Sequence, residues 1–102
     1  MKDSNMQKHI RSREDIVAAI LEIASSKVRQ TMIMYRANLS YSQLRYYLDL
    51  LRSREMLERQ GDALWLTMPR GRDYLRVYAE LQQVIGKQEI LENIGPSLAS
   101  SA

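Results

Sequence analysis

The residues best suited to contact a large anionic partner lie between positions 40 and 54, where polar side chains alternate with leucines at helical spacing. An apolar face there would hold Leu44, Tyr47, Leu48 and Leu51. The opposite face would carry Tyr41, Ser42, Gln43, Arg45, Tyr46, Asp49 and Arg52. In the DNA major groove glutamine pairs with adenine and arginine with guanine. We therefore predict a helix that reads base edges, with Arg45 as its main contact.

Two residues of that face, Gln43 and Asp49, are less suited to contact DNA. Gln43 has a competing role in a capping box with Ser40, and Asp49 would repel phosphate, so the distal half of the helix is expected to stay clear of the DNA backbone. The alternative is that the whole face is simply solvated, as on many amphipathic helices.

Catalysis, metal binding and cofactor binding have no comparable signal. The chain has no cysteine and a single histidine, His9, and it contains no Ser/His/acid set and no glycine-rich phosphate loop. We therefore expect no enzyme activity, no metal and no cofactor.

The charge of the chain is unevenly distributed. The formal net charge is +3 and the pI is near 9.4, with eleven arginines among fifteen basic residues. Residues 27–76 hold ten basic and five acidic side chains, whereas residues 77–102 hold one lysine and three acids. Arginine suits forked contacts with phosphate and guanine. The expected phosphate contacts are Arg29, Arg36 and Arg59, with Gln60 and Gly61 offering backbone amides.

Local signals divide the chain into helices. Ser12 is placed to cap a first helix that ends near Ser25-Ser26, and a second helix is predicted from Val28 to Ala37. Val28, Met32, Tyr35 and Ile33 would form the inner face of the second helix, and Asn38 would close it. Ser40 and Gln43 then form a capping box, flanked by Leu39 and Leu44 as a hydrophobic staple. The third helix would run to about Arg54.

The pattern changes to alternation between Met56 and Thr67. We predict a β-hairpin with a two-residue Gly61-Asp62 turn and with Trp65 on its outer face, packed against the last helix or the leader. Thr67 would cap the last helix, Pro69 would begin it and Gly95-Pro96 would stop it after about Asn93.

The last helix carries an apolar stripe at heptad spacing. Its members are Tyr74, Val77, Tyr78, Leu81, Val84, Ile85, Gln88 and Leu91. The small core would not cover such a helix, so we expect a second copy to cover its distal half. The alternative is that the helix folds back over its own hairpin.

The predicted order of helix, helix, helix, hairpin, helix describes a mostly α protein with a small β-hairpin, that is, a winged helix-turn-helix. The expected organisation is a mobile leader (1–11), a winged helix-turn-helix domain (12–68), a C-terminal dimerisation helix (69–94) and a disordered tail (95–102). No apolar run reaches the roughly 20 residues of a membrane span, so we expect a cytoplasmic protein.

The segment from Ile33 to Tyr41 resembles the helix-turn-helix of the archaeal 10a family, a group of dimeric winged-helix chromosomal DNA-binding proteins, and of related predicted transcriptional regulators. The resemblance covers roughly Ile16 to Leu81, and Tyr-x-Ala-Asn-Leu-Ser is its most specific element. It implies a third helix in the major groove, a wing along the DNA backbone and an antiparallel coiled coil between two last helices. Arg36, where glycine is common, and the short last helix containing Gly86 depart from the family pattern.

The sequence thus predicts a homodimeric protein that binds duplex DNA, either a transcription regulator or a nucleoid-associated chromosomal protein. The alternative is a winged-helix module that docks another protein through its third helix without touching DNA.

Overall fold

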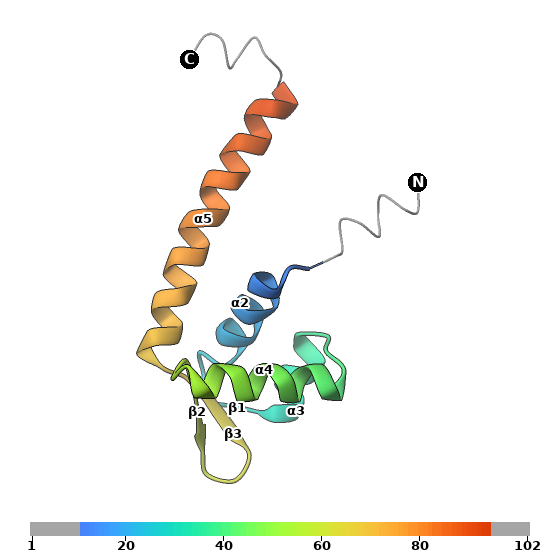
Figure 1. Cartoon of the computed structure of the whole chain (residues 1–102), viewed down its shortest axis with the longest axis vertical. Coiled ribbons are helices and arrows are strands. Elements are labelled where there is room, and N and C mark those ends of the chain that lie inside the picture. The colour runs from blue at the N-terminus through green and yellow to red at the C-terminus, as the bar shows by residue number, and fades with distance from the viewer. Residues whose placement is uncertain (1–10, 95–102) are drawn as a thin grey trace.

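The computed structural model describes residues 11–94, with side chains described as far as Gly86. Within this range the elements follow in the order α2, β1, α3, α4, β2, β3, α5 (Figure 1). The helices α2, α3 and α4 and the small sheet form one body, from which α5 projects. The predicted leader up to residue 10, the Gly95-Pro96 stop and the tail lie outside the described residues.

Helix α2 (Arg13–Ile23) begins where its capping signals predict. The Ser12 hydroxyl accepts a hydrogen bond from the Asp15 amide at 3.0 Å, and the Asp15 carboxylate accepts one from the Ser12 amide at 3.1 Å. Both amides would otherwise lack a partner at the helix start. The stripe that includes Ile16, Ile20 and Leu21 is buried in the core.

The second helix differs from its prediction at its start and in its inner face. Val28 and Arg29 form strand β1 (Val28–Arg29), and helix α3 spans only Gln30–Arg36. Ile33 is fully buried, as predicted, but Met32 is 44% exposed and Tyr35 is 83% exposed. Pairing of β1 with the hairpin sets the rotation of α3 about its axis, and a helical pattern cannot report such a long-range constraint.

The start of helix α4 (Tyr41–Ser53) confirms the predicted capping box between Ser40 and Gln43. Asn38 adopts φ 57°, in the left-handed region that closes α3. The flanking Leu39 and Leu44 are both buried. The predicted inward residues are also buried: Leu44, Tyr47, Leu48 and Leu51.

The hairpin is part of a three-stranded antiparallel sheet in the order β1-β3-β2, so the predicted two-stranded hairpin was incomplete. Strand β2 spans Leu57–Gln60 and strand β3 spans Leu64–Thr67. Because Gln60 pairs with Leu64, the loop has three residues, Gly61 to Ala63, and not the two that were predicted. Gly61 has φ 69°, a conformation that glycine adopts without strain.

Trp65 corrects the predicted facing of the hairpin. It pairs with Val28 of β1, is only 5% exposed and belongs to the hydrophobic core, so its assignment to the outer face was wrong. Strand β1 covers the edge of β3, and the core lies beneath that sheet. Alternation predicted two faces correctly but could not indicate which face meets the helices.

Helix α5 (Pro69–Ile94) begins at Pro69 as predicted, but Thr67 does not cap it. The Thr67 hydroxyl instead donates to the Leu21 carbonyl of α2 at 2.7 Å, and Thr67 is only 1% exposed. Gly71 allows the first turn of α5 to approach closely: a Cβ there would lie 2.6 Å from the Met56 carbonyl oxygen and 2.7 Å from Thr67 Cγ2. Only glycine fits this junction without movement of the backbone.

Two tyrosines fasten α5 to the first turn of α2. The Tyr74 hydroxyl donates to the Glu14 carbonyl at 3.2 Å, and the Tyr78 hydroxyl donates to the Asp15 carboxylate. The Tyr74 and Tyr78 rings stack at 6.3 Å between centroids. The bond from Tyr78 lowers the pKa of Asp15 below its usual value and raises the pKa of Tyr78 to about 12. Asp15 therefore both caps α2 and holds α5.

Replacing Tyr78 with Phe should lower the free energy of unfolding by about 1 kcal/mol at neutral pH, since a partly exposed hydrogen bond to a carboxylate is lost. The depressed Asp15 pKa means that this contribution disappears as pH falls through the folded-state pKa. The raised Tyr78 pKa means that it also disappears as pH rises through about 12. Urea unfolding followed by the fluorescence of Trp65, the only tryptophan, measures the difference across pH.

The control is Tyr35→Phe, because Tyr35 is 83% exposed and its hydroxyl should contribute nothing at any pH. A Tyr78→Phe difference that stays constant into the acid range would contradict the assigned bond to Asp15.

Candidate nucleic-acid interface

The predicted contact residues of α4 lie together on one exposed helix face. Tyr41 is 59% exposed and Tyr46 is 50% exposed, and the polar members of the set are exposed as well: Ser42, Gln43, Arg45 and Arg52. Asp49 shares this exposure, further along the helix. The first two turns of α4 therefore present hydroxyl, amide, guanidinium and aromatic groups and contain no acidic residue. The first acid of the helix, Asp49, lies one turn after Arg45.

Capping constrains the beginning of this face. The Gln43 side-chain oxygen accepts from the Ser40 amide at 2.9 Å, and the Ser40 hydroxyl accepts from the Gln43 amide at 3.2 Å. The Ser42 hydroxyl lies 3.4 Å from that of Ser40. Gln43 thus positions the helix start, and its side-chain NH₂ group remains available as a donor.

Arg45 is held over Tyr41, one helical turn before it. Its guanidinium donates to the Tyr41 hydroxyl at 3.2 Å and lies 6.0 Å from the ring centroid. This hydrogen bond raises the pKa of Arg45 above its already high ordinary value. The contact leaves further N–H donors for a ligand and restricts the orientation of the guanidinium.

Arg13 is a neighbour of this face that sequence reasoning missed. It is the first residue of α2, and its guanidinium donates to the Tyr46 hydroxyl at 2.5 Å and lies 5.8 Å from the ring centroid. Tyr46 also packs edge-on against Tyr47, with centroids 5.0 Å apart. No local pattern could have indicated this pairing, because it depends on how α2 crosses α4.

Arg11 is a second missed residue, and it holds the turn itself. Its guanidinium donates to the Ala37 carbonyl at 2.7 Å and to the Asn38 carbonyl at 3.1 Å. These two carbonyls belong to the turn that follows α3 and precedes Ser40, the N-cap residue of α4. Arg11 therefore joins the start of the described chain to the turn that orients α4.

The other predicted phosphate contacts are spread around α4. Arg36 is exposed in the last turn of α3, whereas Arg29 is exposed on strand β1 and not on a helix. The Arg59 guanidinium donates twice to the Asp62 carbonyl, with the Nε bond at 3.1 Å, so it closes the hairpin loop. Gly61 is exposed beside it, while Gln60 is half-buried.

The arginines after the hairpin bond to groups within the chain. Asp73 pairs with Arg76 at 2.9 Å and not with Arg70. Arg70 reaches the Arg54 carbonyl at 3.5 Å, and Arg72 reaches the Thr67 carbonyl at 3.2 Å. These side chains stabilise the start of α5.

Neither a metal site nor a membrane helix is found in the part of the chain that the structure describes. Among the side chains that the structure describes, no three potential metal ligands lie together in a cluster. No helix in this range is both long and apolar enough to cross a bilayer.

Comparison with known proteins agrees with this geometry. The model of the winged helix-turn-helix family matches residues 10–86. The structure is similar to that of Sso10a-2, a DNA-binding protein from Sulfolobus solfataricus, with a TM-score of 0.72, 20% identity, and coverage of 81% of this chain and 90% of that one. It is also similar to a mutant of Lactococcus lactis ZitR, with a TM-score of 0.62, 13% identity, and coverage of 93% and 70%. No curated protein matches. At these identities the likeness is one of fold, and the first neighbour agrees with the resemblance to the 10a family.

Replacing Arg11 with Ala should destabilise the helix-turn-helix by about 1 kcal/mol, because two carbonyls lose a charged donor at a partly exposed site. Amide hydrogen exchange should become faster around residues 37–39. The matched control is Arg36→Ala, which removes an exposed arginine from the neighbouring turn of α3. Equal exchange rates in the two variants would show that Arg11 does not hold the turn.

Proposed function

Because the chain belongs to the winged helix-turn-helix family, we propose that it is a DNA-binding protein, a transcription regulator or a nucleoid-associated protein of the cytoplasm, that acts as a homodimer. The observation that carries this proposal is the exposed N-terminal half of α4, with a restrained Arg45 at its centre. The structural similarity to Sso10a-2, a DNA-binding protein, supports it. In this proposal the chain is a binding protein and not an enzyme.

In the proposed complex α4 enters the major groove, where Arg45 contacts a guanine edge. A recognition helix contacts base edges with its N-terminal residues, which here are Tyr41, Ser42 and Gln43, with Tyr46 in the next turn. Tyrosine rings can contact a thymine methyl, and the hydroxyls can reach phosphate. Arg13, through its bond to Tyr46, would add a positive charge near the same groove edge.

Phosphate contacts would come from the elements on either side of α4. Arg36 and Arg29 are exposed on α3 and β1, and Arg52 is exposed near the end of α4. We expect a weaker contribution from the wing. Its loop carries Asp62, and Arg59 is already bonded to that loop, so a contact there would use mainly the backbone amide of Gly61.

Replacing Arg45 with Ala should weaken binding to duplex DNA about tenfold or more, as expected for one lost bidentate base contact. Fluorescence anisotropy with a mixed-sequence duplex at about 50 mM salt and at higher salt measures this change. The matched control is Arg76→Ala on α5, where the arginine is bonded to Asp73. Binding of the wild type should weaken steeply with salt, because phosphate contacts release counterions.

The alternative function, docking of a protein on α4, has one observation in its favour. The helix-turn-helix exposes three tyrosines, Tyr35, Tyr41 and Tyr46, and tyrosine is enriched at protein interfaces. Failure of the wild-type protein to bind duplex DNA at low salt would favour this alternative. Loss of DNA binding in both Arg45→Ala and Arg76→Ala would instead point to non-specific charge attraction.

The proposed dimer forms through α5, in the segment assigned to dimerisation (69–94). Tyr74 and Tyr78 are used within the chain, against α2, but the adjoining edge of the stripe is open. Val77 is 55% exposed, Leu81 49%, Val84 60% and Ile85 39%. The same spacing continues at Gln88 and Leu91, whose side chains lie outside the described residues. Exposed apolar side chains in a row at heptad spacing favour a helical partner.

The shape of α5 supports a partner rather than self-coverage. Its 26 residues extend about 39 Å, and Figure 1 shows the helix running away from the hairpin. This direction favours a helical partner over a fold-back of α5 onto its own hairpin. At the base of the stripe a cavity of about 150 Å³, lined by apolar atoms of Tyr74, Val77 and Leu81, could receive a side chain from a second copy.

Replacing Leu81 with Glu should shift the protein toward monomer, because a charge would be buried in the seam without a partner. Sedimentation equilibrium measures the dissociation constant of the dimer. Gln83→Glu adds the same charge on the opposite face of α5, at 3.6 residues per turn, and should leave the dimer intact. Equal weakening in both variants, or a monomeric wild type, would contradict the proposed seam.

A further inference from the structure

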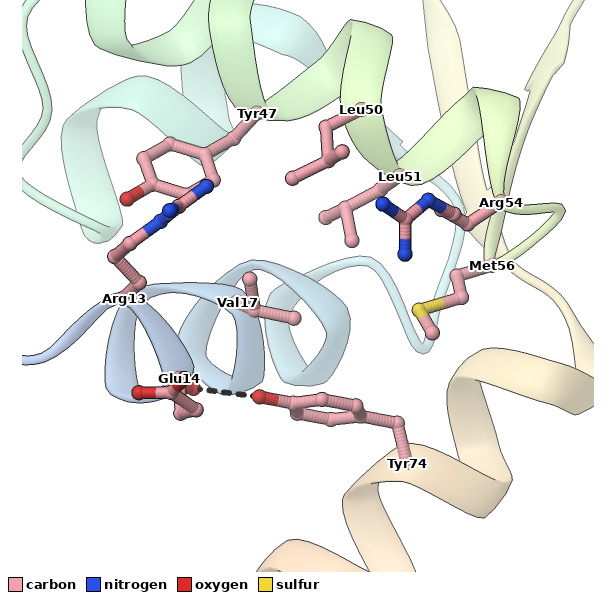
Figure 2. Close-up of a pocket in the computed structure, with 9 residues that line it drawn as sticks. All are labelled: Arg13, Glu14, Val17, Tyr47, Leu50, Leu51, Arg54, Met56 and Tyr74. Carbon is pink, nitrogen blue, oxygen red and sulfur yellow. Dashed lines mark hydrogen bonds between the residues drawn. The ribbon is translucent and has the colours of Figure 1, made fainter.

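A cavity of about 220 Å³ lies where α2, α4 and α5 meet (Figure 2). Its apolar wall is formed by Val17 of α2, Leu50 and Leu51 of α4, and Met56 of the following segment. The Tyr74 ring of α5 closes one side, with its hydroxyl bonded to the backbone of α2. The cavity is thus bounded by three helices that are otherwise joined through the core.

The edge of this cavity carries more positive than negative charge. Arg13 and Arg54 line it from opposite ends, and Glu14 is the one acid among the lining residues. Figure 2 shows the Arg54 side chain extending from the end of α4 toward Leu51. The Arg13 guanidinium bonds to the Tyr46 hydroxyl and keeps other N–H groups available. An apolar wall beside two guanidinium groups is complementary to a ligand with an apolar body and an anionic end.

We propose that this cavity is a binding site for a small aromatic carboxylate. An engineered apolar cavity of about 150 Å³ is large enough for benzene, so 220 Å³ accommodates one ring with a carboxylate at the opening. The ring would pack on Val17, Leu50 and Met56. The carboxylate would accept hydrogen bonds from Arg54, with Arg13 contributing charge. Phosphate or another bare inorganic anion would leave the apolar wall uncovered and is a poorer match.

Ligand binding in this cavity would affect the position of α4 relative to α5. The walls include Leu50 and Leu51 of α4 and Tyr74 of α5, and Arg13 links the cavity edge to Tyr46 on the exposed face of α4. A ligand that withdraws Arg13 from Tyr46, or that fixes α4 against α5, would alter DNA binding. This consequence rests on the proposed function, whereas occupation of the cavity does not.

The test uses the full-length protein without DNA, so that its failure is distinct from a failure of the DNA-binding proposal. Benzoate and its neutral analogue benzyl alcohol are titrated while amide chemical shifts are followed by NMR. Benzoate should bind with a dissociation constant on the order of 1 mM, with shift changes concentrated at residues of the cavity wall. Benzyl alcohol should bind about tenfold more weakly, because it lacks the charge.

Three variants locate the site. Arg54→Met keeps an apolar side chain of similar length and should weaken benzoate binding about tenfold, with little change for benzyl alcohol. Leu50→Phe fills the cavity and should weaken both ligands. Arg52→Met removes an arginine from the same helix that does not line the cavity and should change neither. Equal affinity for the two ligands, or wild-type benzoate affinity in both Arg54→Met and Leu50→Phe, would overturn the proposal.

Discussion

Thr67 determines how the β-sheet is attached to the end of α2 and where α5 begins. Its amide donates to the Ala24 carbonyl at 2.8 Å, and its hydroxyl donates to the Leu21 carbonyl at 2.7 Å. These carbonyls lie at the end of α2, where a helix lacks its own donors. Because Thr67 is the last residue of β3, this pair of bonds joins the sheet to α2. It also fixes the point from which α5 departs, and Gly71 lets the first turn of α5 stay close to that point.

From this junction the chain gains two surfaces with different physical character. On one side, α4 is held by a capping box, by the Leu39 and Leu44 staple and by Arg11 on the preceding turn. Its polar and aromatic face is therefore presented at a fixed angle. On the other side, α5 is held at its base by Tyr74 and Tyr78 and extends beyond the core. The proposed function uses both surfaces: the polar and aromatic face of α4 would contact DNA, and the apolar stripe of α5 would contact a second copy.

Asp15 and Arg13 show how a short segment can serve both surfaces. Asp15 completes the cap of α2 and accepts from Tyr78 on α5, while Arg13, two residues earlier, donates to Tyr46 on α4. The first turn of α2 is therefore in contact with both α4 and α5. The cavity beside it is lined by residues of α2, α4 and α5, so a movement of α4 relative to α5 would change its shape.

The sequence by itself determined the features that depend on neighbours in the chain. Ser12, Ser40 and Gln43 mark helix starts because their side chains bond to amides three residues away, and Leu44, Tyr47, Leu48 and Leu51 mark an inner face because helical spacing aligns them. Only the tertiary structure decided features that depend on pairing at a distance. Strand β1 exists because Val28 and Arg29 pair with β3, and this pairing replaces the predicted first turn of α3. Trp65 faces inward because it shares its face of β3 with Thr67, which bonds to α2. Arg11, Arg13 and Thr67 act on residues at least 26 positions away, so no local pattern could assign their roles.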